Sequence, residues 1–217
     1  MATRTRLTKA ERRGTILAAA KTLFGERGYR KTEVEAIAAA CYVTKPMIYR
    51  HFPGGKAELF IAVLDEHVSR LMSVLWEAIS SSSDPRHRLH RGLRAYVDFA
   101  QENPQGFHLL ASATGEIDPE IGARLRDVRE RLAKGLSTTI ADVMAAAGLR
   151  AEGAEIYAHA LLGGVDSVLS WWLHEGEVDV DSVVDYLLAF VWRGFDGLPR
   201  DPKRFHIERN RAPATRG

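Results

Sequence analysis

The sequence predicts an all-helical protein with a small N-terminal helix-turn-helix domain and a larger helical domain. Apolar residues recur every three or four positions along most of the chain, and strand alternation and hairpin signals are nearly absent. The charge changes sign along the chain: residues 1–56 carry a net +8, residues 57–197 a net −10, and residues 198–217 a net +4. With 217 residues the chain can bury a sizeable core, and we expect about nine helices.

The first three expected helices lie in the basic segment, and local signals mark their ends. Thr8-Lys9-Ala10-Glu11 has capping-box spacing and starts the first helix, which Gly28 ends in a left-handed cap. A second box, Thr32-Glu33-Val34-Glu35, opens a short helix. After a turn at Cys41-Tyr42-Val43, Thr44 caps a third helix that runs to Phe52, before Pro53-Gly54-Gly55.

The acidic segment predicts five longer helices and one short one. Asp84-Pro85 and Asp118-Pro119 each combine a capping carboxylate with a first-turn proline. We expect the helices at residues 56–80, 85–103, 107–110, 119–148, 151–174 and from 179 onward. The basic tail, residues 198–217, is expected to be flexible.

Composition excludes several classes of protein. No stretch reaches the roughly 18 apolar residues of a membrane span, since even Val180–Phe195 contains three charged residues. The only cysteine is Cys41, and no signal-peptide pattern opens the chain, so we expect a cytoplasmic protein. A basic module on an acidic body suggests that the module meets a polyanion, of which nucleic acid is the obvious example, with solvated charged faces as the alternative.

Enzyme and metal signals are weak. His87 and His90 have i, i+3 spacing, but no third ligand is apparent and arginines surround them, so no metal is expected and an exposed basic face is favoured. Cys41 is expected to be a small buried residue rather than a nucleophile. Nucleophile-elbow, P-loop and dinucleotide patterns are absent, so no cofactor is expected.

Two capped short helices joined by a three-residue turn have helix-turn-helix geometry, whose second helix enters the major groove. The pattern Thr32-x-Val34-x2-Ile37-Ala38, then Val43-Thr44-Lys45-Pro46-x-Ile48-Tyr49-Arg50-His51-Phe52, then Lys56-x2-Leu59, resembles the DNA-binding domain of TetR-type bacterial regulators. Ile16-Leu17-x-Ala19-Ala20-x2-Leu23-Phe24-x3-Gly28-Tyr29 extends it upstream. Beyond roughly residue 60 the resemblance covers only length and helical plan.

The resemblance implies DNA contacts on the second and third helices. Base contacts are implied for Lys45, Pro46 and Met47, phosphate contacts for Tyr49, His51 and Lys56 and at the helix starts Thr32 and Thr44, and either kind for Arg50. Two departures stand out. Tyr42 replaces the glycine usual in the turn, so either the turn avoids positive φ or Tyr42 is strained there, and Pro53-Gly54-Gly55 holds one residue more than is usual before Lys56.

For the rest of the chain the resemblance implies an effector-binding and dimerisation domain at residues 56–197, following a DNA-binding domain at residues 1–55. Such proteins bind palindromic operators as two-fold dimers. The resemblance implies that the two subunits of the dimer contact each other through the last two helices. We expect interface residues at Gly163, Gly164, Trp171, Trp172, Leu187, Leu188, Val191 and Trp192, with the chain's own core as the alternative for each. A small-molecule pocket is expected to include Trp76, Tyr96, Phe99, Phe107, His108 and Leu110, again with core as the alternative.

These expectations describe a homodimeric repressor that a small effector releases from its operator. Residues 107–110 would form a movable element between the pocket and the DNA-binding domain. Two alternatives remain at this point: a DNA-organising or interaction protein with no effector, which predicts a filled core between residues 56 and 148, and an all-helical enzyme, which needs convergent catalytic groups.

Overall fold

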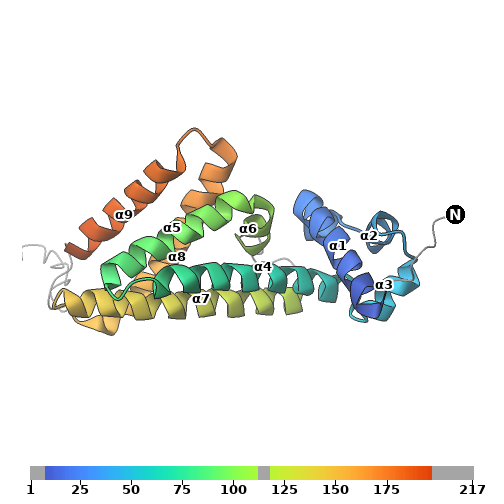
Figure 1. The fold of residues 1–217 in the computed structure, drawn as a ribbon, viewed down its shortest axis with the longest axis horizontal. Coiled ribbons are helices and arrows are strands. Elements are labelled where there is room, and N and C mark those ends of the chain that lie inside the picture. The colour runs from blue at the N-terminus through green and yellow to red at the C-terminus, as the bar shows by residue number, and fades with distance from the viewer. Residues whose placement is uncertain (1–7, 112–117, 197–217) are drawn as a thin grey trace, which may run out of the picture.

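A computed structural model of the chain describes residues 8–111 and 118–196. Within these ranges the protein consists of nine α-helices and one short 3₁₀ helix, η1, with no strand, which confirms the predicted all-helical class (Figure 1). The expected tail at residues 198–217 lies outside the described residues. The elements are α1 (Lys9–Lys31), α2 (Val34–Ala40), α3 (Lys45–His51), α4 (Gly55–Ser80), α5 (Pro85–Glu102), α6 (Pro104–Ala111), α7 (Pro119–Ala146), η1 (Ala151–Gly153), α8 (Ala154–Glu175) and α9 (Val180–Asp196).

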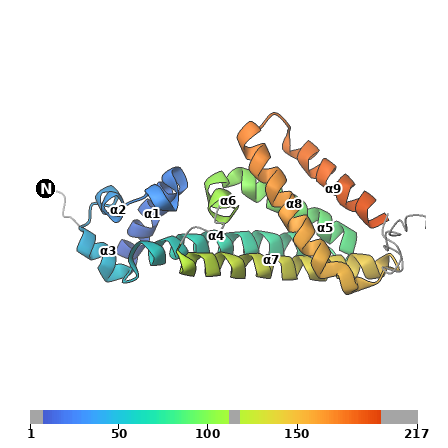
Figure 2. The same cartoon turned by 180° about the vertical axis from the view of Figure 1, so that it is seen from behind.

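Helices α1, α2 and α3 gather at one end of an elongated molecule, and α4 and α7 run side by side along it (Figures 1 and 2). Helix α5 packs on α4, α8 packs on α7, and α9 lies outermost against α5. The core of α1 to α3 continues into the start of α4 and includes Leu109, Ile121 and Leu125 from α6 and α7. The two parts of the protein therefore share buried apolar surface.

Three of the helix starts predicted from capping residues form with the expected hydrogen bonds. The Thr8 hydroxyl accepts from the Glu11 backbone N–H, and the Glu11 carboxylate accepts from the Thr8 N–H. Asp84 and Asp118 accept from the backbone N–H groups two residues on, each ahead of its first-turn proline. These contacts fix where three helices begin.

Three of the predicted local features are wrong. Thr44 is the N-cap of α3, but its side chain makes no cap hydrogen bond. The expected second capping box does not form, because α2 begins at Val34 and its N-cap, Glu33, makes no side-chain cap hydrogen bond. At Gly28, φ is +74° and ψ is +170°, outside the left-handed helical region, so the glycine kinks α1 and helical structure continues to Lys31. Only glycine adopts this combination of φ and ψ without strain, which explains why residue 28 is glycine.

Tyr42 resolves the alternative left open for the turn. Its φ is +55°, the only positive value among the described non-glycine residues, and its side chain is 90% exposed. The turn therefore keeps the left-handed conformation and places a tyrosine in it without packing to compensate.

Tyr42→Gly is expected to raise the free energy of unfolding by about 0.5–1 kcal/mol, because a Cβ in this conformation costs ~1–2 kcal/mol, partly offset by the entropy of an unfolded glycine. Chemical denaturation measures it. Tyr42→Ala, which keeps the Cβ, is the matched control and is expected to stay near the parent. Equal stability of the glycine and alanine variants would contradict the strain argument.

Candidate DNA-binding surface and ligand cavity

Helix α3 presents one polar face to solvent and buries the other. Lys45, Tyr49 and Arg50 are exposed, whereas Ile48 and Phe52 are fully buried against α1 and α2. Of the other predicted contacts, Thr44 and Pro46 are exposed and Met47 is half-buried. Thr44, Lys45 and Pro46 lie at the start of this short helix, which is the end that a helix-turn-helix places against base edges, and Tyr49 and Arg50 lie in its last turn.

Lys45 is held by an ion pair across the turn. Its Nζ lies 2.5 Å from the Glu35 carboxylate on α2. The hydrogen bond from Lys45 lowers the pKa of Glu35, and the carboxylate raises the pKa of Lys45. Both side chains lie at the surface, where such pairs contribute little to stability. Lys45 can therefore exchange this partner for an acceptor on DNA.

Two of the predicted phosphate contacts lie inside the domain instead. Thr32 is fully buried, and its hydroxyl donates to the carbonyls of Leu23 and Gly28, 3.1 Å and 2.8 Å away. The His51 side chain is also buried, which lowers its pKa together with nearby cations, and its carbonyl accepts from Arg13 at 2.6 Å. Neither side chain reaches the surface where a phosphate could lie, so both serve the fold.

Lys56 is half-buried and packs on α1. Its Nζ lies 4.6 Å from the centroid of the Tyr29 ring and donates to the Arg30 carbonyl at 3.3 Å. The preceding Gly55 has a φ of +67°, and a Cβ there would approach the Tyr49 ring to 3.0 Å. The unusual loop before Lys56 thus supports Tyr49 from behind and turns Lys56 toward α1.

The larger part of the chain contains a mainly apolar cavity of about 420 Å³ that is open at one side. Its exposed lining comes from α4 and α7, where Trp76 and Gly135 mark the mouth. Its buried lining comes from α5 and α8 and from Thr139 of α7. The size and lining fit a small-molecule site. The lining residues are Met72, Leu75, Trp76, Ile79, Arg88, Leu89, Gly92, Leu93, Tyr96, Arg131, Leu132, Gly135, Leu136, Thr138, Thr139, Leu161, Leu162 and Val165.

Only two of the six predicted pocket residues line this cavity, Trp76 at the mouth and Tyr96 inside. Phe99 and Phe107 are buried in the protein core, and the His108 ring lies 4.8 Å from that of His174. Leu110 lines a separate void of about 10 Å³ beside Tyr96. The sequence pattern missed the aliphatic residues that form most of the wall.

Tyr96 connects the cavity to a buried polar network. Its hydroxyl donates to Asp166 at 2.7 Å, and the other oxygen of that carboxylate accepts from Arg129 at 2.7 Å. Burial raises the pKa of Tyr96 well above its usual value and also raises that of Asp166. The network joins α5, α7 and α8 at the wall of the cavity.

Helix α6 lies between the cavity and the DNA-binding domain. Phe107 packs 6.2 Å from the Tyr96 ring, measured between centroids, and α6 also packs against α1. At Gly25 of α1 a Cβ would come within 2.6 Å of Gln105, and a Cβ at Gly106 would overlap the His67 ring of α4. These two glycines therefore allow α6 to pack closely against α1 and α4.

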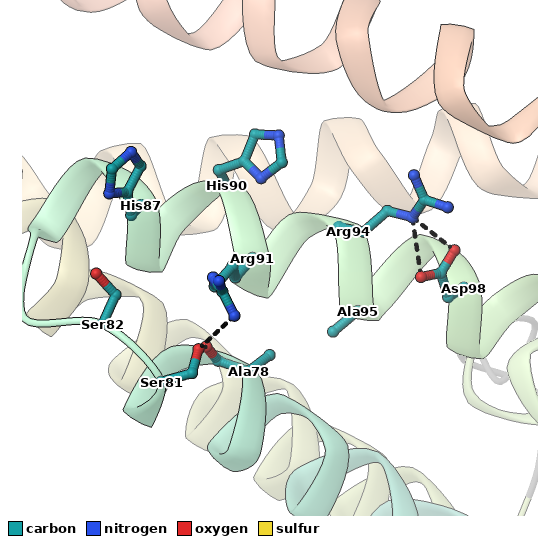
Figure 3. A pocket seen from close by; sticks show the side chains of 9 residues that line it. All are labelled: Ala78, Ser81, Ser82, His87, His90, Arg91, Arg94, Ala95 and Asp98. Carbon is teal, nitrogen blue, oxygen red and sulfur yellow. Dashed lines mark hydrogen bonds and ion pairs between the residues drawn. The ribbon is translucent and has the colours of Figure 1, made fainter.

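A second hollow lies between the end of α4 and α5, and most of the residues that line it are polar (Figure 3). Its arginines are already paired: Arg91 donates to Ser81, and Arg94 to Asp98 and Asp181. His87 and His90 are exposed there, as the basic-face prediction expected. Hydrated, internally paired charges make this groove a weaker ligand site than the apolar cavity.

A possible metal cluster exists elsewhere on the surface. Among the described residues, one set of three potential ligands, Glu130, Glu155 and His159, brings its ligand atoms within 4.8 Å of one another. All three side chains are exposed, and exposed acidic groups commonly gather without a metal.

Helices α8 and α9 expose an apolar stripe that differs from the predicted dimer surface. Trp172, Leu187, Leu188 and Val191 are buried in the chain's own core, which corrects their assignment, and Trp192 is half-buried beside Arg86. Gly163, Gly164 and Trp171 are exposed as predicted. The large exposed side chains that the prediction missed are Ile156, Tyr186 and Phe190, at 73%, 75% and 79%.

Within the described residues, no helix combines the length and the apolar character that crossing a membrane demands.

Two family profiles match the chain. The profile described as bacterial regulatory proteins of the tetR family matches residues 16–63, and the one described as a tetracyclin repressor-like C-terminal domain matches residues 82–195. Both recognised parts of the protein thus carry the same family signal.

Individual relatives agree with the profiles. The chain is 33% identical to the HTH-type transcriptional activator FasR of Mycolicibacterium smegmatis over 89% of this chain and 87% of the relative. A TetR-like transcriptional regulator from Rhodococcus has a TM-score of 0.75 at 28% identity, covering 89% of this chain and 100% of that one. The nucleoid occlusion factor SlmA of Pasteurella multocida is 26% identical over 57% of this chain and 62% of its own length.

Proposed function

Because the chain belongs to the TetR family of bacterial transcriptional regulators, we propose that it acts as a homodimer that leaves a palindromic operator when a small molecule fills the α4–α5–α7–α8 cavity. DNA-binding regulation is the family's activity, and its members are not enzymes. The cavity is the single observation that carries the effector part, because it is mainly apolar and of ligand size.

On DNA, α3 lies in the major groove. Lys45, Pro46 and Met47 face the bases, while Thr44, Tyr49 and Arg50 reach phosphates or base edges. Lys45 gives up Glu35 for a base acceptor, which costs little because the pair is exposed. Lys56 contributes to DNA binding only after leaving Tyr29, so it is the weakest of the proposed contacts.

The dimer forms through the exposed stripe of α8 and α9. Gly163 and Gly164 have open space where a Cβ would stand, so a second copy can approach the backbone of α8 closely. Trp171, Tyr186 and Phe190 supply apolar area beside this flat strip. Two such helices from each subunit form a four-helix interface.

Ligand and DNA act on each other through α6. A ligand in the cavity contacts Tyr96, whose neighbour Phe107 belongs to α6, and α6 packs closely against α1. Movement of α1 changes the spacing of the two recognition helices, so DNA and ligand each weaken the other's binding by the same factor, with ~1–3 kcal/mol of coupling.

The sign of control depends on the position of the operator. A dimer that covers a promoter represses it, whereas one bound upstream activates; the relative FasR is named an activator. We propose repression for this chain. Deleting its gene is then expected to raise transcription from the promoter that bears its operator, and a fall would assign activation instead.

A DNA-organising role without an effector is the competing function. It is considered because one relative, SlmA, is named a nucleoid occlusion factor. That role predicts a filled core between residues 56 and 148. The cavity, lined in large part by residues of α4, α5 and α7 within that segment, favours an effector.

Substitutions on α3 test the DNA-binding surface. Lys45→Ala is expected to weaken binding to the operator and to relax specificity, by ~1–3 kcal/mol for a lost base contact, whereas Tyr49→Phe weakens binding to all sequences alike. The measurement is a titration against DNA from the gene's own upstream region at several salt concentrations, with nonspecific competitor. Full affinity of both variants would refute this docking.

A further inference from the structure

We propose that the cavity selects apolar ligands that carry an uncharged oxygen acceptor, such as a carbonyl, and that Arg88 Nε–H donates a hydrogen bond to this oxygen. The inference rests on the proposed function, because it specifies the effector of the same cavity.

Arg88 is a lining residue of this mainly apolar cavity, and it carries one unused donor. Its Nη2 donates to Asp142 on α7 at 2.5 Å, but its Nε is buried and has no hydrogen-bond partner. Among the described residues only one other buried side-chain nitrogen or oxygen, His51 Nδ1, is unpaired, and it lies in the DNA-binding domain. A buried N–H without a partner is unfavourable, so an acceptor that reaches it gains a full hydrogen bond.

The other polar groups near the cavity do not supply a competing donor at the end where Arg88 lies. The Tyr96 hydroxyl already donates to Asp166. Thr139, the buried threonine of the lining, stands one helical turn before Asp142 on α7 and so shares the end where Arg88 lies. The polar end is therefore built from Arg88 and Thr139, with apolar residues beyond.

The charge balance favours a neutral oxygen over a carboxylate. The Arg88 guanidinium is neutralised by Asp142, and Arg131 at the mouth is paired with Asp127. A carboxylate would thus enter an apolar cavity with no free cation to compensate it. Its oxygen would also lie close to the Asp142 carboxylate.

Helix geometry gives the ligand a direction. Arg88 and Tyr96 both line the cavity from α5 and are eight residues apart, which corresponds to ~12 Å along a helix. With its oxygen at Arg88, a ligand of this length extends its apolar end to Tyr96, next to Phe107 of α6. The acceptor fixes the ligand, and the apolar end contacts the element that leads to α1.

The test compares three nine-carbon probes: 2-nonanone, nonane and nonanoate. Each displaces the neutral dye N-phenyl-1-naphthylamine from the purified full chain, and its dissociation constant is measured at pH 7. We expect 2-nonanone to bind about three- to tenfold more tightly than nonane, and nonanoate to bind more weakly than 2-nonanone. Arg88→Lys keeps the charge beside Asp142 but removes Nε–H, so it is expected to erase the preference for the ketone while leaving nonane unchanged.

Thr139→Val is the matched variant, because it changes the same end of the cavity without touching Arg88. It is expected to keep most of the ketone preference. Equal binding of ketone and hydrocarbon, tighter binding of the carboxylate, or an undiminished preference in Arg88→Lys overturns the inference while leaving the cavity as effector site. If neither the dye nor any probe binds the protein, the proposed effector function itself fails.

Discussion

The double variant Tyr186→Arg/Phe190→Arg is expected to be a folded monomer with an operator affinity about 100-fold or more below that of the parent. Both side chains are more than 70% exposed on α9 and lie one turn apart on one face. Two guanidinium groups there meet their counterparts across a two-fold axis, so the interface gains repulsion and loses apolar contact. A monomer holds only one half-site, and the avidity of two linked modules, about 10²–10⁴, is lost.

Sedimentation or light scattering measures the mass, and operator titration measures the affinity. Trp76→Arg is a suitable control, because Trp76 is a large exposed aromatic at 69% but lies on α4 and is not part of the exposed stripe of α8 and α9. It is expected to remain dimeric. A double variant that stays dimeric with an unchanged circular dichroism spectrum would rule out this stripe as the interface.

The dimer stripe illustrates what sequence pattern decides and what it does not. Helix α9 is apolar on more than one side, so its sequence predicts burial but not which side faces the chain's own core. That choice depends on how α9 is rotated on α5, where Val183, Val184, Leu187 and Leu188 turn inward. The sequence-based prediction assigned the inward-facing residues to the dimer interface, because such apolar residues are typical both of a protein core and of a dimer interface.

Most residues of the ligand cavity could not be predicted from the sequence, for a similar reason. Leucine is the commonest residue of its walls, and these leucines have the same spacing as core leucines. A cavity arises only where helices distant in sequence fail to fill the space between them. The predicted aromatics Phe99 and Phe107 instead fill core positions. By contrast, the helix starts at Thr8, Asp84 and Asp118 depend on residues two or three positions away, so the sequence predicts them well.

Gly135→Phe is expected to produce a regulator that binds its operator but no longer responds to ligand. Gly135 is an exposed residue of α7 at the cavity mouth, and a Cβ there meets no atom within 4 Å. A benzyl group has open space to enter, so the fold is kept while the volume available to a ligand shrinks. The affinity for N-phenyl-1-naphthylamine is expected to fall at least about tenfold, since the displaced apolar contact is worth ~1.5–3 kcal/mol.

Gly135→Ala separates blockage from a change in the helix. Alanine is favoured over glycine within a helix by ~0.8–1 kcal/mol, so this variant is expected to unfold at higher denaturant concentration and to bind the dye as the parent does. If the phenylalanine variant binds dye like the alanine variant, ligands do not enter between α4 and α7. If it loses both dye and operator, the substitution has disturbed the fold. If Trp76 and Gly135 form the mouth, the phenylalanine variant is expected to lose dye binding and to keep its operator affinity. The contacts from Tyr96 through α6 to α1 are then intact, but no ligand is bound to shift them.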